Sequence, residues 1–214
     1  MDGAGLQGRL HACWARVGAR VGLDYAVFRP VSALDPLADG CRVLAALRCC
    51  LSDRGSLEAP QAFGHVEWFS WHDAGLTRVG DYLCGPMGTF FVAAQQSLMT
   101  PLLVQCNRVL TFSRPAQPLG VGAVGYGAEL VAGDALLLRG WPGSCLEGGK
   151  GEENRVGLPL DVRNPWWRVL LPAWPGVELR VGDVFVDEVG NRYVVGSAER
   201  TALGWRLKAV LRQV

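Results

Sequence analysis

The sequence lacks the features by which a nucleic-acid-binding or membrane-spanning protein is usually recognised. Its 21 lysine and arginine residues nearly balance 20 acidic residues, for a formal net charge of +1, and no run of basic residues occurs. Net charge therefore gives no reason to expect binding to DNA, RNA or an anionic membrane, although folding can still assemble a basic patch. No window approaches the roughly 18 apolar residues that a membrane-spanning helix needs. With Asp2 near the start and no apolar segment of the signal-peptide kind, we expect folding in the cytoplasm.

Motifs that carry known chemistry are scarce as well. There is no CxxC, HxH or HExxH metal pattern, no GxSxG and no phosphate-binding loop. The best metal candidates are His65, His72, Asp73 and Cys84, but the odd step between the two histidines places their rings on opposite faces of a strand. His72 and Asp73 fit a turn with capping hydrogen bonds better. We therefore expect no metal and no cofactor.

The seven cysteines are odd in number and irregularly spaced, which favours a reducing compartment over a disulfide framework. Most are expected to be small buried hydrophobic residues. The adjacent Cys49 and Cys50, with His65 and His72 downstream, are the strongest nucleophile candidates. A thiol in an apolar run is poorly ionised, so a non-enzymatic protein is favoured. A soluble cysteine-dependent hydrolase acting through either thiol is the alternative.

A chain of 214 residues that is 50% hydrophobic, with 28 glycines and 12 prolines, predicts a packed, mainly β protein with many turns. Residues 1–60 are the exception, because apolar residues recur there at helical steps: Leu6, Leu10, Cys13, Trp14, Val17 and Val21. Gly18 and Gly22 mark the end of this helix. Residues 23–37, punctuated by Pro30 and Pro36, predict an extended arm that reaches a neighbouring subunit or packs loosely. Residues 41–52 fit a short helix or a strand.

One sequence motif occurs twice in the chain. "RVGD" occurs at residues 78–81 and again at 180–183, and both copies continue in step through a second glycine and an aromatic-valine pair. Glycine followed by aspartate permits a tight turn in which the carboxylate accepts backbone N–H bonds, and a glycine at a hairpin tip can take positive φ. The predicted structural turn residues are Gly80, Asp81, Gly88, Gly182, Asp183 and Gly190.

The repeat predicts two related small β-barrel or sandwich modules, residues 61–115 and 166–214. Each would contain a hairpin and a return strand, the latter at residues 102–114 and 204–212. Residues 116–165 form a Gly-rich connecting region, with a strand at 135–139 and an exposed loop at 147–154. "WPG" occurs at residues 141–143 and 174–176 and predicts an aromatic-anchored turn closing each module.

Most tryptophans should fill module cores, although a carbohydrate-binding β-module presenting them is a further alternative. Trp166 and Trp167 are adjacent, so in a strand they face opposite ways, and at least one of them is either covered by another layer or exposed to a partner. The residues predicted to form interfaces are Trp14, Phe28, Trp166, Trp167, Glu152 and Glu153.

The duplicated stretches also resemble a known family. "GDYLCGPMGTFFVAAQQSLMTPLLVQCNRVLTFSRP", residues 80–115, is similar to a segment of tail-associated or head–tail proteins of tailed bacteriophages. "VGDVFVDEVGNRYVVGSAERTALGWRLKAVL", residues 181–211, resembles the β-barrel core of phage stopper and tail-joining proteins, which contain one barrel rather than two. The similar regions cover roughly residues 61–115 and 178–212. That family has no catalytic residues, so none carries over.

The resemblance implies a structural virion protein of the head–tail connector or tail. Such a protein would be made and assembled in the host cytoplasm. It would self-associate into a ring and contact other connector or tail proteins, with DNA only as the content of the lumen and no membrane partner.

Overall fold

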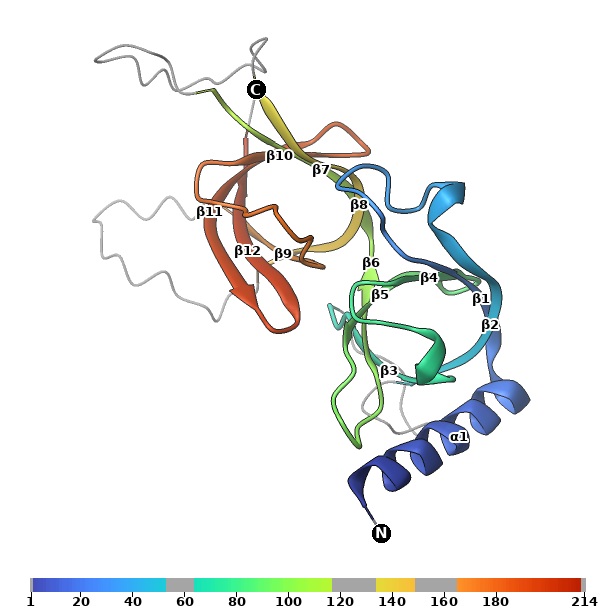
Figure 1. Ribbon diagram of the computed structural model, residues 1–214. Coiled ribbons are helices and arrows are strands. Elements are labelled where there is room, and N and C mark those ends of the chain that lie inside the picture. The colour runs from blue at the N-terminus through green and yellow to red at the C-terminus, as the bar shows by residue number, and fades with distance from the viewer. Residues whose placement is uncertain (1, 53–63, 117–133, 149–164, 213–214) are drawn as a thin grey trace.

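The computed structural model describes residues 2–52, 64–116, 134–148 and 165–212. They form one α-helix and two closed antiparallel barrels, side by side (Figure 1). The first barrel follows helix α1 (Gly3–Val21) and consists of β1 (Leu23–Phe28), β2 (Arg42–Ser52), β3 (Glu67–Trp71), β4 (Tyr82–Gly85), β5 (Gly88–Ala94) and β6 (Leu102–Cys106). The second consists of β7 (Arg108–Arg114), β8 (Ala135–Glu147), β9 (Trp166–Leu171), β10 (Val184–Asp187), β11 (Arg192–Thr201) and β12 (Gly204–Leu211). Two short 3-10 helices, η1 (Asp39–Cys41) and η2 (Ala74–Leu76), complete the first half.

The two barrels have the same topology. Around the first, the strands are ordered β1-β2-β3-β6-β5-β4, and around the second β7-β8-β9-β12-β11-β10. Each strand of the second barrel therefore takes the place of the strand six positions earlier in the chain. The predicted pair of related β-barrel modules is confirmed, and the duplication extends over all the strands of each barrel rather than over one hairpin.

Several local expectations are corrected by the strand pairing. Residues 23–28, expected in an arm, form β1, which pairs with β2 and β4, and the ambiguous residues 41–52 are almost entirely β2. The single strand expected at residues 102–114 is two strands, one in each barrel, that meet at Asn107. Residues 141–143 lie within β8 instead of forming a turn, whereas residues 174–176 do form one. The barrels therefore use strands from regions expected to be arm and connector.

Asn107 explains why one apolar run becomes two strands. Its side chain binds the backbone of β8 through both amide atoms, with Nδ2 donating to Cys145 O at 2.9 Å and Oδ1 accepting from Cys145 N at 2.7 Å. The asparagine thus satisfies backbone groups of a neighbouring strand while the chain passes from one barrel to the next.

The barrel interiors follow the alternation of the strands. The first is filled by Tyr25, Val27, Leu47, Cys49, Leu83, Phe90, Val92 and Leu103, all buried. A larger cluster fills the second barrel and continues into the boundary with the first. There the outward-facing Tyr82 of β4 stacks edge-on against Trp141 of β8, with ring centroids 6.2 Å apart, and donates its hydroxyl to Pro142 O at 2.9 Å. The barrels are therefore joined through a packed, hydrogen-bonded interface.

The segment after β1 strengthens this interface. Leu34 forms a parallel bridge with Arg139 of β8, Ala33 O accepts from the Trp141 indole at 2.7 Å, and Asp35 pairs with the Arg139 guanidinium. The part of the predicted arm that lies outside β1 thus reaches the second barrel of its own chain.

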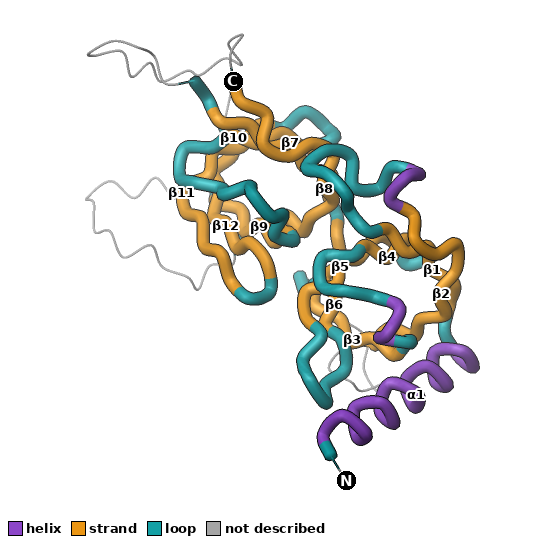
Figure 2. The backbone as a smooth tube through the Cα atoms, in the orientation of Figure 1, coloured by secondary structure: helices purple, strands orange, loops and turns teal. Residues whose placement is uncertain are grey.

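Helix α1 lies against one end of the first barrel (Figure 2). Asp2 caps it by accepting from Gly5 N at 2.7 Å, and Gly22 ends it. Only Trp14 and Gly18 are buried. A Cβ on Gly18 would lie 2.6 Å from Trp71 O and 2.7 Å from Arg48 O, so glycine is what lets the helix approach the strands. Among the described helices, none is long and apolar enough to cross a membrane.

Candidate functional site

The repeated turn has the same atomic construction in both copies. Asp81 accepts from Arg29 Nε at 2.9 Å and Nη2 at 2.7 Å, and from Arg78 N at 2.8 Å. Gly80, with φ of +91°, donates to Val92 O at 2.9 Å. A bidentate arginine–carboxylate pair is among the strongest hydrogen-bonded arrangements in proteins, so this pair fixes the turn between the strands.

The second copy repeats each contact. Asp183 accepts from Arg114 Nε at 2.8 Å and Nη2 at 3.0 Å, and from Arg180 N at 2.7 Å, and Gly182 has φ of +89°. Both aspartates are buried. The hairpin glycines Gly88 and Gly190 also have positive φ, at +112° and +95°. Each of the six predicted structural turn residues thus lies in a turn or at a hairpin tip.

The arginines are the residues that sequence reasoning missed, although a signal was present. Arg29 directly follows β1 and Arg114 is the last residue of β7, the first strand of each barrel, and each arginine is followed by proline. The dipeptide Arg-Pro occurs at these two places only. It extends the repeat to the first strand of each barrel, and hydrogen bonds to the aspartate raise the pKa of both arginines.

The hairpin tips of the two copies differ. Asp187, at the end of β10, accepts from Asn191 N at 2.8 Å, Asn191 Nδ2 at 3.0 Å and Val189 N at 3.1 Å. Burial opposes its charge, but these bonds outweigh burial and hold the pKa of Asp187 below its usual value. The first copy has Gly85 at this position, where a Cβ would lie 2.5 Å from the Tyr25 ring. Each tip is therefore fitted to its own neighbours.

A cleft lies between the barrels where the first copy of the turn meets the second barrel. It encloses about 240 Å³ and is lined by Arg29, Pro30, Arg78, Val79, Gly80, Asp81, Trp141, Ala173, Trp174 and Pro175. Trp141 and Trp174 form its aromatic wall, with ring centroids 5.8 Å apart. A mostly apolar cleft with a few polar groups, located between two structural units, is the usual form of a binding site.

The two arginines of the cleft differ in what they can bind. Arg29 is held by Asp81, whereas the exposed Arg78 has no ion pair within the described residues. An apolar group entering beside Trp174 could therefore place a negative charge against Arg78. The lining residues do not include a nucleophile beside a base.

The cysteine–histidine candidate proves to be a buried polar cluster under α1. Cys49 Sγ lies 4.0 Å from His72 Nδ1, and the same nitrogen lies 2.5 Å from Ser70 Oγ. His72 Nε2 lies 2.8 Å from Thr77 Oγ1, which accepts from Gln95 Nε2 at 2.6 Å. Cys49 and His72 are buried. The structure thus brings together two of the four residues singled out for thiol chemistry, inside the protein.

Burial makes this pair neutral. It lowers the pKa of His72 to about 4 and raises the pKa of Cys49 to about 12. Thiol nucleophiles act as thiolates, so Cys49 is not activated in this conformation. Burial also raises the pKa of the half-buried Cys50. The cluster therefore has the chemistry of a hydrogen-bonded core, with both ring nitrogens of His72 engaged.

The metal candidates are not brought together. Asp73 accepts from Gly75 N at 3.1 Å and begins η2, the predicted capping role. Cys84 lies on β4, where Thr89 Oγ1 donates to its sulfur at 3.7 Å. Across residues 2–52, 64–116, 134–148 and 165–212, no three His, Cys, Asp or Glu side chains are placed to hold a metal ion.

The predicted interface residues occupy different environments. Trp14 is a buried residue of α1, and Phe28 is buried in the cluster that spans the barrel boundary. Trp167 points into the second barrel, with its ring 5.7 Å from that of Tyr193, whereas Trp166 points outward beneath Lys208. Glu152 and Glu153 lie outside the described residues.

Comparisons of the chain with protein families, with curated proteins and with solved structures found no match.

Proposed function

We propose that the protein is a structural virion protein of a tailed bacteriophage, which assembles into a ring at the head–tail connector or in the tail. The observation that carries the proposal is the pairing of two like barrels, which are joined by a buried interface and each contain the same Arg–Asp anchor. A duplicated, pre-organised body of this kind suits a building block that holds its shape while its surfaces meet other subunits.

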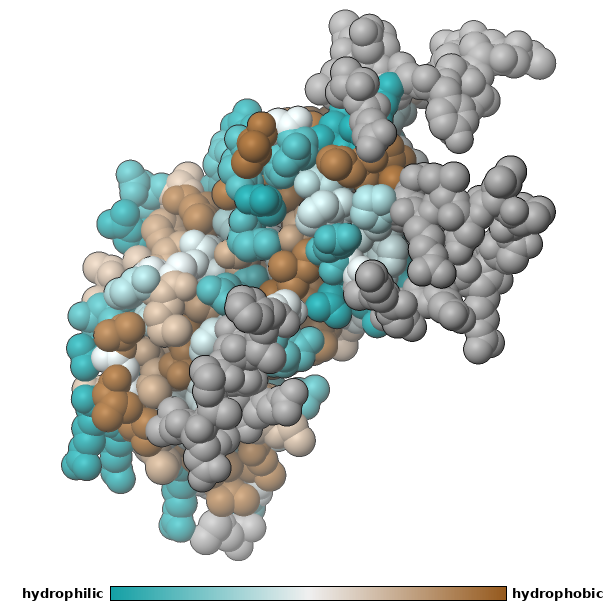
Figure 3. Space-filling model, turned by 180° about the vertical axis from the view of Figure 1, so that it is seen from behind, coloured by the Kyte–Doolittle hydropathy of each residue, from teal (hydrophilic) through white to brown (hydrophobic). Residues whose placement is uncertain are grey.

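Docking would use side chains rather than strand addition, because closed barrels have no free strand edge. Apolar residues reach the surface over both halves of the molecule (Figure 3). Val79 and Val181, at equivalent positions of the repeated turn, are 55% and 69% exposed. The exposed valines give the subunit one apolar contact point on each barrel, and a heterologous interface in a ring would bring each of them against a different, complementary surface of a neighbouring subunit.

A second group of exposed apolar residues lies on α1 and on the segments that pack against it. We call it the end patch, and it consists of the exposed Leu6, Leu76, Leu98 and Met99. Its parts are held together because η2 packs against α1 and because Gln7 of the helix accepts a hydrogen bond from Leu98 N. The proposed occupant is the neighbouring copy of this chain, with other connector or tail proteins at the faces of the ring.

The proposal is tested by the mass of the purified chain in solution and by its presence in virions. Light scattering after size separation should show a discrete oligomer of the 23.1 kDa subunit. Replacing Leu98 and Met99 together by lysine should dissociate it, whereas the control Leu203→Lys, at the β11–β12 turn, should not. A monomer at every concentration, together with absence from purified particles, would overturn the proposal.

A further inference from the structure

The outer face of the second barrel gathers cations from separate parts of the sequence. Along β9 and β12, side chains alternate between the interior and the surface. Trp205, Leu207 and Ala209 point inward and are buried, so Arg206 and Lys208 point outward. Arg168 of β9 lies opposite Lys208 in the strand register and therefore points to the same side. The surface of these two strands thus presents Arg168, Arg206 and Lys208 together.

This placement brings like charges close together on one face of the barrel. Like charges directly opposite each other on neighbouring strands repel. Arg168 has no ion pair within the part of the chain that the structure describes. Arg206 pairs with Glu199 at 3.1 Å, but both side chains are 56% exposed, so the pair is weak and Glu199 is easily displaced. A group of cations on one face is the electrostatic feature by which a protein attracts an anionic partner.

The indole ring of Trp166 orients the ammonium group of Lys208. Lys208 Nζ lies 4.9 Å from the centre of the indole ring, a cation–π distance. The ring packs closely on Gly148, where a Cβ would lie 2.0 Å from it, so only glycine fits there. With Lys208 over the ring and Gly148 packed against it, Trp166 is a support for Lys208 rather than a platform for a stacked ligand.

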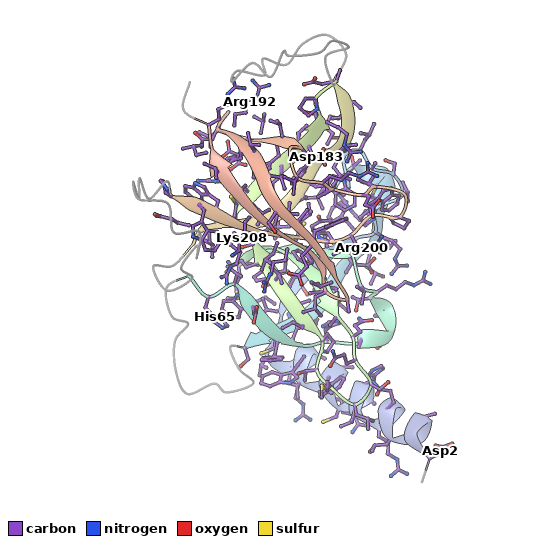
Figure 4. All side chains as sticks on the ribbon, turned by 90° about the vertical axis from the view of Figure 1, so that its left-hand side faces the viewer. Asp2, His65, Asp183, Arg192, Arg200 and Lys208 are labelled. Atoms are coloured by element: carbon purple, nitrogen blue, oxygen red, sulfur yellow. The ribbon has the colours of Figure 1, made fainter. Side chains whose placement is uncertain are left out.

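A hollow of about 110 Å³ opens among these side chains and is lined by Glu67, Trp166, Arg168, Leu170, Arg206, Leu207 and Lys208. Figure 4 shows Lys208 at the surface of the second barrel, on the side where His65 precedes β3. The hollow is small, and on the side formed by the second barrel it is lined by the cations Arg168, Arg206 and Lys208. Glu67, from β3 of the first barrel, is its acidic wall.

We propose that this face, the β9–β12 cationic face, binds the phosphodiester backbone of a nucleic acid without reading its sequence. Arg206 and Lys208 are two residues apart on one strand, about 6.6 Å, and Arg168 lies one strand away, about 5 Å. Phosphates recur along a nucleic-acid strand at spacings that such a cluster can follow, and arginine binds them bidentately. The hollow accepts a phosphate group but leaves no aromatic face open for a base.

The inference does not need the ring assembly, since it depends on one face of one barrel. It also agrees with the net charge, because the local cations come from positions 168, 206 and 208 and form no run in the sequence.

The test is binding of fluorescein-labelled 20-nucleotide DNA, single-stranded and duplex, measured by anisotropy between about 50 and 200 mM salt. With up to three phosphates neutralised, log K should fall with log salt with a slope of about −2 to −3. The triple variant Arg168→Gln, Arg206→Gln, Lys208→Gln should reduce affinity at least tenfold. A matched control removes three exposed arginines elsewhere, Arg42→Gln, Arg48→Gln and Arg180→Gln, and should lose far less.

Two further measurements separate a binding role from a structural one. Glu67→Gln should tighten binding, because it removes the negative charge from the hollow. Arg168→Gln should leave the melting temperature unchanged or raise it, because it relieves repulsion in the free protein. The proposal is overturned if the wild-type chain does not bind either DNA at the lowest salt, if the control loses as much as the triple variant, or if polyglutamate competes as well as DNA at equal charge.

Discussion

Replacing Asp183 by asparagine tests the central structural element, the duplicated anchor. The change keeps the shape of the side chain but removes its charge and one acceptor. Arg114 donates to both carboxylate oxygens, and Arg180 N donates to one of them. Asparagine has one acceptor oxygen, and its amide nitrogen would face a donor. At least one donor in this buried turn is therefore left without its acceptor.

The size of the effect follows from burial. Removing one partner of a buried ion pair costs about 3–5 kcal/mol. The Asp183 side chain is 2% exposed but that of Arg114 is 34% exposed, so water recovers part of the loss. We therefore expect the free energy of unfolding to fall by ~3 kcal/mol, at the lower end of this range. For a chain of this size that lowers the melting temperature by about 6–12 °C.

The assay is urea unfolding followed by tryptophan fluorescence, with the melting temperature measured by calorimetry. Asp81→Asn should cost a similar amount, because its contacts with Arg29 and Arg78 match those of the second copy. Glu199→Gln is the control, since it removes one partner of an exposed pair and should cost less than about 1 kcal/mol. The reasoning is refuted if Asp183→Asn costs no more than Glu199→Gln.

Three further predictions concern the helix and the buried cluster. Gly18→Ala should destabilise the protein, because its Cβ would meet backbone carbonyl oxygens of β2 and β3. Gly8→Ala has open space around its Cβ and should stabilise the protein by up to about 1 kcal/mol. Urea unfolding of both variants checks this prediction. Burial lowers the pKa of His72 from 6.5 to about 4, so the unfolded chain binds more protons between these values. The free energy of unfolding should therefore fall by roughly 3 kcal/mol as pH drops from about 6.5 to about 4. This fall should be smaller in His72→Gln, and an equal fall in that variant would contradict the lowered pKa of His72. Iodoacetamide should label the exposed Cys13 readily and Cys49 only after unfolding, which mass spectrometry of digests would show. Ready labelling of Cys49 in the folded protein would instead support the alternative of a cysteine-dependent hydrolase.

The repeat could be found in the sequence because it consists of residues whose role is local. Gly80 and Gly182 are needed for positive φ, and Asp81 and Asp183 accept from a backbone N–H three residues earlier. Such constraints act within a few residues, so they leave the same letters in both copies. For the same reason the N-terminal helix was predicted, since its apolar residues recur at helical steps.

β1 and the part of β8 beyond residue 139 were harder to predict because their contacts are with residues that are distant in the chain. β1 pairs with β4, and Arg29, which completes the anchor, lies 52 residues before Asp81 in the chain. β8 carries a glycine–tryptophan–proline sequence, which is typical of a turn. In the structure Pro142 accepts from Tyr82 of the other barrel and Trp141 is buried, so tertiary packing overrides the local preference.

The candidate sites follow the same division between local and distant contacts. The inter-barrel cleft needs Arg78 of one barrel and Trp174 of the other, and the cationic face needs the register that places Arg168 beside Lys208. Neither juxtaposition can be inferred until the strand order is known. The tendency of Trp166 and Trp167 to face opposite ways was predictable, because it depends only on the alternation of a strand.

The two barrels keep the residues that fix the backbone, together with the exposed Val79 and Val181, and differ over much of their remaining surface. The Arg-Pro, the Arg-Val-Gly-Asp turn and the hairpin glycine occur in both copies. By contrast, α1 and the end patch belong to the first barrel, and the β9–β12 cationic face belongs to the second. A duplicated barrel whose anchors are retained can change its outer surface at little cost to stability. The individual function of each half should therefore lie on its outer strands and loops, which is where the proposed subunit and nucleic-acid contacts are placed.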